Sequence, residues 1–462
     1  MSEYIYDRLY SQMKFPTIIQ DLLDCPGLLR LRDVRMANNQ FFAFPAFANS
    51  SRYEHSLGVC YLAGICADHM GLSEKDKIEL MIAGLYHDVG TPPFAHAMEE
   101  VLQAKFDFDH EENLRKLITG TSENYDQDFA QVYLGQSLKL NSFCQSKKAA
   151  MLGIDSHRIA NIAVGDKTDE LSPLINGSAM DLDNIDNICR AVSAMGIMNG
   201  QVDFSTLAQK LASSFILKSG KIVYNNDYEK EINQWLLLRD IQYTHIYKSI
   251  DDFSYQTMIK RAIHIIGDKE GINGLDKNLW RLTDSEFTIK YLLSNEESKP
   301  LMERVLLCKP YPPLALLYVR GEGSTKYINT NIRSIEKEVS QYIYNKVGLD
   351  RFLKNDLILA NFYPDKRHRW IPEEKWAVKT KAEFGVKQEE GAILGLFTPA
   401  KVTGYVTDPE SKARAIRHFD RRNLSDLITE VKKLLNGFEV TEYDAEIDRR
   451  NSSSHGEYQL GF

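Results

Sequence analysis

The chain has 462 residues, 43% of them hydrophobic and 26% charged, which is ordinary for a globular protein with room for two or three domains. Its formal net charge of −8 excludes an overall basic surface of the kind that binds nucleic acid. Only a local basic cleft could therefore bind nucleic acid, and nucleic acid is not the favoured partner.

The N-terminal residues MSEYIYDRLYSQ are too polar for a secretory signal peptide, and no run of about 18 apolar residues occurs that could cross a membrane. The six cysteines are scattered and form no CxxC pair. Several of them lie in apolar helical runs, a pattern typical of free thiols in a reducing compartment. These features predict a cytoplasmic, mostly helical protein without a membrane span.

Helical spacing of apolar residues dominates the first part of the chain. The predicted helices cover residues 17–35 with a break at Pro26–Gly27, 53–70, 75–89, 108–118, 126–135, two segments within 157–194, and 228–266. Ser73 is a typical N-cap for the third of these helices, and His87 and Asp88 fall in its last turn.

The segment FILKSGKIVYN alternates apolar and polar residues around a Ser-Gly turn, which predicts a β-hairpin. Beyond about residue 300, LALLYV, LILANFY and AILGLFT are typical of strands. The predicted fold is therefore mainly α. A helical core with a small β-hairpin covers residues 1–300, a mixed α/β region suited to oligomerisation or regulation covers 301–450, and a polar flexible tail covers 451–462. The helices that carry the chemistry are expected within 50–195 and 228–266.

Histidines gather in one part of the sequence. His55, His87, His96 and His110 all precede residue 111, and Asp88 directly follows His87. A single histidine is usually structural, but a divalent metal needs neutral imidazoles and carboxylates from several elements. His55 and the His87–Asp88 doublet converge if their two helices pack antiparallel.

Asp183 is the candidate for a fourth ligand, in the segment AMDLDNIDNICRA. The apolar positions of this segment define its buried side. Asp183, Asn187 and Arg190 lie at i, i+4 and i+7 on one polar stripe. The alternative is a solvated face with an ordinary Asp–Arg helix pair, and spacing alone does not choose between them.

The order of these motifs resembles the HD-domain phosphohydrolases, in the contexts RYEHSLGV, GLYHDVGTPPFAH and MDLDNIDN. Within that group it is similar to the deoxynucleoside triphosphate triphosphohydrolases. The similarity includes LLDCPGLLRLRDVR and LLLRDIQYTHIYKSIDDFSYQTMI, and it covers roughly residues 1–290. It implies an HD-domain helical bundle and a divalent metal ion, which could be Mg, Mn, Fe, Zn or Co.

The resemblance also assigns roles to individual residues. The implied metal ligands are His55, His87, Asp88 and Asp183. The implied acid–base and orienting residues are His96, His110 and Glu111. The implied substrate contacts are two phosphate-clamping arginines, Arg52 and Arg239, and a sugar-facing or base-facing aromatic, Tyr247, with Asn184 and Asn187 at two further contact positions.

Five positions depart from the family pattern. Thr91 stands where a second histidine is usual in the HD loop. Asn184 replaces a phosphate-contacting lysine, Asn187 replaces a pocket aromatic, Ala191 replaces a sugar-reading acid, and Met36 replaces a sugar-reading glutamine. The metal core is therefore complete while nucleotide recognition is altered. The lost contacts indicate a different substrate preference or a pocket that an activator completes.

The function that this pattern favours is metal-dependent hydrolysis of a (deoxy)nucleoside triphosphate to nucleoside and triphosphate. The resemblance further implies a homo-oligomer, tetrameric or hexameric, with activation by a nucleotide and a role in nucleotide-pool control or antiviral defence. Two alternatives stay open. One is an HD-type phosphodiesterase, signalling-nucleotide hydrolase or nuclease on the same metal site. The other is a non-catalytic nucleotide sensor.

Overall fold

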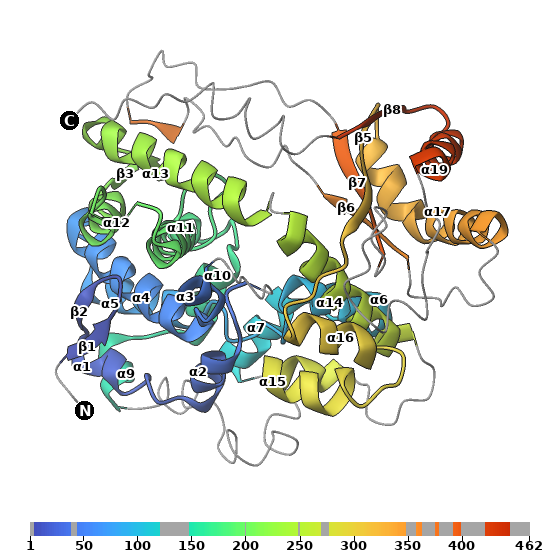
Figure 1. Cartoon of the computed structure of the whole chain (residues 1–462). Coiled ribbons are helices and arrows are strands. Elements are labelled where there is room, and N and C mark those ends of the chain that lie inside the picture. The colour runs from blue at the N-terminus through green and yellow to red at the C-terminus, as the bar shows by residue number, and fades with distance from the viewer. Residues whose placement is uncertain are drawn as a thin grey trace. The chain divides into compact units, whose positions relative to one another are not determined.

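The structure is a computed structural model that describes residues 4–37, 44–120, 147–198, 200–247, 250–268, 277–347, 357–362, 375–377, 391–398 and 421–443 (Figure 1). It divides into two compact units. The first comprises Met1–Tyr247, Ile259–Cys308 and Arg369–Gly385, and the second comprises Lys248–Met258, Lys309–His368 and Val386–Phe462. Two predicted segments, the helix at 126–135 and the tail at 451–462, lie outside the described residues.

The first unit opens with a β-hairpin that the sequence reading missed. Strands β1 (Tyr4–Asp7) and β2 (Ser11–Lys14) pair antiparallel. The predicted helix at 17–35 is divided into shorter pieces, and the second piece begins at Pro26, a residue suited to the first position of a helix. These pieces and the next helix are α1 (Thr17–Gln20), α2 (Pro26–Arg30), η1 (Leu31–Asp33) and α3 (Pro45–Ala48).

The next two helices confirm their predictions closely. Helix α4 (Arg52–Met70) is buried on most sides because α2, α5, α11 and α12 all pack against it. Ser73 caps α5 (Glu74–Tyr86) by accepting a hydrogen bond from the Asp76 N–H. Helix α5 ends at Tyr86, however, so His87 is its C-cap and Asp88 lies in the loop that follows.

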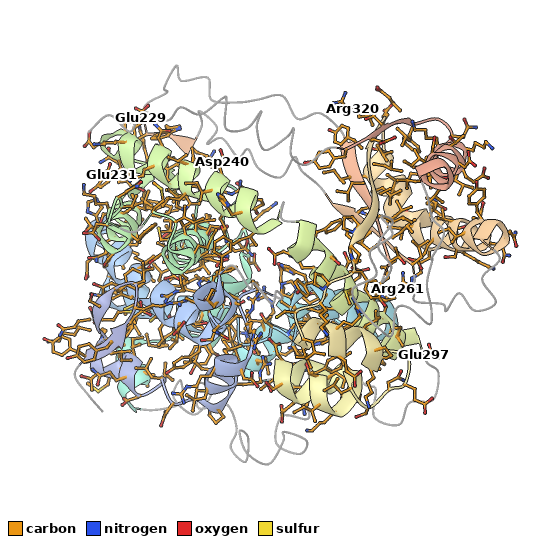
Figure 2. All side chains as sticks on the ribbon, viewed as in Figure 1. Glu229, Glu231, Asp240, Arg261, Glu297 and Arg320 are labelled. Atoms are coloured by element: carbon orange, nitrogen blue, oxygen red, sulfur yellow. The ribbon has the colours of Figure 1, made fainter. Side chains whose placement is uncertain are left out.

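Among the remaining helices of the first unit, those at 110–119, 156–164 and 182–195 match predicted helices, the predicted helix at 228–266 is divided into pieces, and the others were not predicted. These remaining helices are α6 (His96–Phe106), α7 (His110–Thr119), α9 (Lys147–Leu152), α10 (Ser156–Val164), η2 (Ser172–Leu174), α11 (Leu182–Met195), α12 (Phe204–Ala212), η3 (Asn226–Tyr228), α13 (Glu229–Gln242), the π-turn η4 (Tyr243–Tyr247), α14 (Ile250–Asp268), η5 (Lys277–Arg281), α15 (Asp284–Phe287), η6 (Thr288–Leu292) and α16 (Lys299–Leu306). Helix α14 belongs partly to the second unit. Figure 2 shows Glu229 and Glu231 at the start of α13, where acidic side chains complement the helix dipole.

The predicted hairpin is confirmed. Strands β3 (Phe215–Lys218) and β4 (Lys221–Tyr224) pair antiparallel with Lys218 opposite Lys221. The two turn residues, Ser219 and Gly220, have φ of 52° and 72°, as a tight two-residue hairpin turn requires.

The second unit is built on a four-stranded antiparallel sheet of order β6-β7-β5-β8. Its strands are β5 (Pro313–Arg320), β6 (Ile358–Phe362), β7 (Gly391–Phe397) and β8 (Glu439–Glu442), of which the sequence predicted the first three. Helices α17 (Ser324–Val347) and α19 (Arg421–Leu434) pack on the sheet and on each other, and their apolar side chains form one core with the strands. The mainly α fold with a mixed α/β C-terminal region is thus confirmed.

Two further expectations concern the cysteines and the membrane. Cys60, Cys66, Cys189 and Cys308 are free thiols, as predicted, and the first three are buried. Among the described residues, no helix is both long and apolar enough to cross a membrane.

Candidate active site

Close packing of α4 against α5 sets the base of the site. A Cβ atom on Gly84 of α5 would lie 3.1 Å from Cγ1 and 3.3 Å from the carbonyl oxygen of Val59 on α4. A glycine at this position therefore lets the helix backbones approach closely. The approach brings His55, in the first turn of α4, next to His87 at the end of α5, so the predicted convergence is confirmed.

Three side chains point their ligand atoms at one another. His55 Nε2 lies 3.2 Å from His87 Nε2 and 2.8 Å from Asp183 Oδ1, and His87 Nε2 lies 3.8 Å from the same carboxylate oxygen. These three atoms form a group that could hold a metal ion. Two ligand atoms on one ion usually lie about 3 Å apart, since each bond is about 2.1 Å long.

The other ring nitrogens show which atoms carry protons. His87 Nδ1 lies 2.8 Å from the Gly84 carbonyl oxygen, which only accepts, so Nδ1 is the donor. His55 Nδ1 lies 2.7 Å from Asp186 Oδ2, a carboxylate that also accepts from Arg190. In the neutral forms, both Nε2 atoms therefore present lone pairs to the same point as Asp183 Oδ1.

Asp88 contributes a fourth acceptor. Its Oδ1 accepts from Arg52 Nη1 at 2.7 Å and from Thr91 Oγ1 at 3.1 Å. Its Oδ2 is buried, lies 3.6 Å from His87 Nε2, and has no hydrogen-bond partner within the described ranges. Burial raises the pKa of Asp88, but the charges of Arg52 and the two histidines lower it well below its usual range.

Three acceptors that face one another, with an orphaned buried carboxylate oxygen of Asp88 3.6 Å from one of them, fit a divalent cation. The pKa of His55 reflects the negative charge of the carboxylates around it. Burial lowers the pKa of His55, but hydrogen bonds and charges from Asp183 and Asp186 raise it to about 10. Asp183 is 36% exposed, so the site opens to solvent on that side.

A second layer of contacts holds His55 in place. Asp186 accepts from His55, from Arg190 Nε at 2.9 Å and from the Tyr10 hydroxyl at 2.7 Å. Arg190 Nη1 in turn donates to Asp7 Oδ2 at 2.8 Å. Such contacts fix the orientation and tautomer of a ligating histidine.

Arg190 corrects one of the readings of the sequence. It is only 2% exposed, and it pairs with Asp186 and Asp7 and not with Asp183. The solvated face is therefore wrong for Arg190, whereas an Asp–Arg helix pair is present with Asp186 as the partner. Gly58 on α4 leaves the space that the Arg190 and Asp186 side chains occupy. A Cβ on Gly58 would lie 2.0 Å from Asp186 Oδ1 and 2.6 Å from Arg190 Nη2.

The residues predicted for acid–base roles lie at the starts of two helices. His96 begins α6, its side chain is 90% exposed, and its Nδ1 lies 2.8 Å from Glu99 Oε2. His110 and Glu111 begin α7 and are exposed. Burial raises the pKa of Glu99, but the hydrogen bond from His96 and the electrostatic influence of His96, His110 and Arg52 lower it below its ordinary value.

Gly90 brings α7 to the loop after the His-Asp doublet. A Cβ on Gly90 would lie 3.3 Å from both the His110 carbonyl oxygen and Leu114 Cβ. The start of α7 therefore packs directly on the loop that carries Asp88, and a side chain at position 90 would push His110 away.

The predicted substrate contacts are partly engaged within the protein. Asn184 donates from its side chain to Asp181 Oδ1 at 2.8 Å, the same oxygen that caps α11. Asn187 Oδ1 lies 3.4 Å from Gln242 Nε2. Arg239 is buried, and its guanidinium lies over the Tyr243 ring at 4.3 Å.

Tyr247 is the last residue of η4, and its side chain is outside the described part of the structure. Of the family departures, Thr91 is buried and bonds Asp88, so it supports the metal end of the site. Ala191 lies in a small apolar cluster with Phe47, Ala48, Met195 and Ile246. Met36 is half-buried, and its N–H donates to the Ser50 carbonyl oxygen at 3.0 Å.

A family comparison bears directly on this arrangement. The model of the family described as "HD domain" matches residues 52–150. The chain carries an HD domain. The matched range begins at Arg52, includes the His87–Asp88 doublet that gives this domain its two letters, and ends before Asp183.

The sequence of the chain is also similar to proteins whose names state an activity. Over 418 residues the chain is 28% identical to the deoxynucleoside triphosphate triphosphohydrolase SAMHD1 homolog of Dictyostelium discoideum, a match that covers 85% of this chain and 74% of that protein. It is 34% identical over 102 residues to human deoxynucleoside triphosphate triphosphohydrolase SAMHD1, which covers 21% of this chain and 16% of the human protein. The predicted resemblance to dNTP triphosphohydrolases is thus confirmed as homology.

The fold is also found in a solved structure. The crystal structure of a hypothetical protein from Aquifex aeolicus superposes with a TM-score of 0.59 at 20% sequence identity, covering 86% of this chain and 97% of that one. The similarity is one of fold, and it includes parts of both units.

Several residues of the site escaped the sequence reading. They are three supports of His55 (Asp7, Tyr10 and Asp186) and the partner of His96 (Glu99), whereas Arg190 was noted but placed on a stripe with Asp183. Glu99 had a detectable signal, because His96 and Glu99 are three residues apart at a helix start. Asp7 and Tyr10 had none, because they reach the site from a hairpin and lie 183 and 176 residues, respectively, before their partners Arg190 and Asp186.

Proposed function

We propose that the chain is a metal-dependent hydrolase of deoxynucleoside triphosphates that releases nucleoside and inorganic triphosphate. The observation that carries this proposal is the convergence of His55, His87 and Asp183, with the orphaned Asp88 oxygen beside them, in a chain homologous to dNTP triphosphohydrolases. When bound there, a divalent ion polarises a phosphoryl oxygen and lowers the pKa of a water molecule.

The protein's own groups supply orientation and charge. Arg52 holds Asp88 through Nη1, which fixes the carboxylate so that Oδ2 faces the metal position. Its guanidinium also places positive charge beside the cleavage site, and we propose that it contacts a phosphate of the substrate. Arg239 is the second proposed phosphate contact, with Tyr247, Asn184 and Asn187 towards the nucleoside.

Proton transfer is proposed for the exposed histidines. Water attacks the α-phosphorus, the bond from that phosphorus to the 5′-oxygen breaks, and the 5′-oxygen takes up a proton. His96 suits the role of donor because Glu99 fixes its Nδ1 while the side chain is largely exposed. His110 and Glu111 are proposed to orient the water or the triphosphate from the start of α7.

A nucleotide screen tests the proposal. Purified protein is incubated with Mg²⁺, Mn²⁺, Fe²⁺, Zn²⁺ or Co²⁺ and with each dNTP and NTP, singly and in pairs, and tripolyphosphate and nucleoside are measured. We expect both products in equal amounts with at least one metal and nucleotide. Pairs are included because activation by a second nucleotide is part of the proposal. Product release no greater than that of a His87→Ala, Asp88→Ala double variant in every condition would contradict it.

A second phosphohydrolase activity has support from two of the substrate positions. Asn184 is bound to Asp181, and Ala191 is packed in an apolar cluster, so neither position resembles the charged contacts of the family. The screen therefore includes a cyclic dinucleotide and single-stranded DNA. Cleavage of either at a higher rate than any nucleoside triphosphate would favour the phosphodiesterase or nuclease alternative. Homo-oligomerisation and a role in nucleotide-pool control or antiviral defence stay predictions.

A further inference from the structure

The loop between the His-Asp doublet and His96 has an unfavourable backbone. Phe94 and Ala95 have φ of 57° and 43°, and Ala95 has ψ of −123°. Residues with a Cβ atom avoid this left-handed region, so the conformation persists only where the surrounding structure holds it. The two residues directly precede His96, which means that whatever holds them also sets the position of His96.

A buried carboxylate from a distant segment holds this backbone. Asp284 is 7% exposed and begins α15, whose preceding residue Thr283 forms a capping box with Glu286. Its Oδ1 accepts from the Phe94 N–H and its Oδ2 accepts from the Arg35 N–H, both at 2.9 Å. One carboxylate therefore joins the strained loop to residue 35.

The second end of this bridge leads to Arg52. Arg35 forms an antiparallel bridge with Ser51, and the Arg52 N–H donates to the Val34 carbonyl oxygen at 2.9 Å. Asp284 thus connects the backbone that carries His96 to the backbone that carries Arg52.

A buried guanidinium holds the other side of the same loop. Arg30 is 1% exposed, and its Nη2 donates to the carbonyl oxygens of Val89 at 3.0 Å and Thr91 at 2.6 Å. Its Nη1 donates to the carbonyl oxygens of Trp280 at 3.2 Å and Leu282 at 2.9 Å. Arg30 therefore links the two segments 89–91 and 280–282 by binding carbonyl oxygens in both. Asp284 links the same loop to α15 by accepting from the Phe94 N–H.

We propose that Asp284 and Arg30 are positioning residues that hold the loop of residues 89–95 in its strained form and so place His96 and Arg52 for the reaction. They touch neither the substrate position nor a metal ligand's side chain. The catalytic consequence rests on the proposed function, whereas the effect on the loop does not. Loss of either clamp frees the backbone before His96 and leaves the ligand atoms of His55, His87 and Asp183 in place.

The test separates loop order from metal binding and from turnover. Asp284→Asn keeps the size of the side chain but replaces one carboxylate oxygen with an NH₂ group. That group would face the N–H of either Phe94 or Arg35 and could not accept from it. We expect amide hydrogen exchange at residues 92–97 to be about tenfold faster, since the loop opens more often. We expect kcat to fall about tenfold because His96 is misplaced. Mn²⁺ affinity by titration calorimetry and the KM for nucleotide should stay within about twofold of wild type.

Two further variants keep the result interpretable. Ser285→Ala, at the next position, removes only an exposed hydrogen bond to Asp33 and should match wild type in all four measurements. Arg30→Lys, which reaches fewer of the four carbonyls, should show the same pattern as Asp284→Asn and serves if that variant fails to fold. Unchanged exchange at residues 92–97, or a loss of Mn²⁺ binding parallel to the loss of protection, would overturn the proposal. If the wild type releases no triphosphate, the proposed function fails while the exchange result still decides the role of the clamp.

Discussion

The inner and outer halves of the candidate site are held very differently. In the inner half, formed by the proposed metal ligands, His55, His87 and Asp88 each have a further protein contact that fixes the side chain, to Asp186, to the Gly84 carbonyl and to Arg52 respectively. In the outer half, His96 is 90% exposed with Glu99 as its recorded partner, and His110 and Glu111 are exposed. The side chains of the inner half are therefore held by the protein itself, whereas those of the outer half are largely exposed.

The largest expected effect comes from breaking the inner half. His87→Ala removes one of the four proposed ligands and leaves His55, Asp88 and Asp183. We expect Mn²⁺ affinity to fall at least about 100-fold, and nucleotide hydrolysis to fall by more, since no ion is left to polarise the phosphate. Titration calorimetry and triphosphate release measure the two effects. Wild-type metal affinity in this variant would remove His87 from the ligand set.

Breaking the outer half should give a smaller loss of a different kind. His96→Ala is expected to lower kcat about 100-fold with metal affinity unchanged, because a general acid contributes roughly that much. Glu99→Gln keeps a hydrogen-bond acceptor for His96 and should lower kcat by about tenfold or less. Rate measurements at saturating nucleotide, with metal content checked on the same samples, distinguish the halves. Loss of metal from the His96→Ala variant would show that the two halves are not separate.

Much of the inner half was predictable, and particular residues show why the rest was not. His55, His87 and Asp183 were found because two helices of clear periodicity carry them and because the order of motifs resembles a known family. The end of α5 was predicted one turn too late, since apolar Val89 continues the helical spacing although the chain has already turned. The burial of Arg190 was not predicted, because it depends on Asp7 and Gly58, two positions that only the folded chain brings to it.

The support of the inner half can be tested by filling its tightest space. Gly58→Ala places a methyl group against Asp186 and Arg190, and neither can move without breaking the buried network. We expect the free energy of unfolding to fall by about 2 kcal/mol in urea titrations.

Gly64→Ala is the matched control on the same helix. Its new methyl group meets the flexible end of Met81 at 3.2 Å, so the change in free energy should be within about 1 kcal/mol of zero once the helix gains from alanine. Equal effects of the two substitutions would mean that the space at Gly58 is not special.

The smallest expected effect tests the most distant support. Tyr10→Phe removes one hydrogen bond to Asp186 and leaves the ring packed, so Mn²⁺ affinity should fall about tenfold, as usual for contacts behind a metal ligand. Tyr61→Phe is the control, because Tyr61 packs on the Tyr10 ring at 5.2 Å without joining the network. Calorimetric titration of both variants should show a change only for Tyr10→Phe, and equal affinities would place Tyr10 outside the support of His55.

The hydrogen bonds around His55 also constrain the order of events during synthesis. They join residues that are 128, 131, 176 and 183 positions apart in the sequence. Helix α4 leaves the ribosome early, but Asp183, Asp186 and Arg190 must follow before its histidine has any partner from α11. Contacts of such separation form slowly, because a long stretch of chain must be closed into a loop before they are made. An ion that needs both His55 and Asp183 would therefore be bound only late in biogenesis, after α11 has been synthesised and has packed against α4.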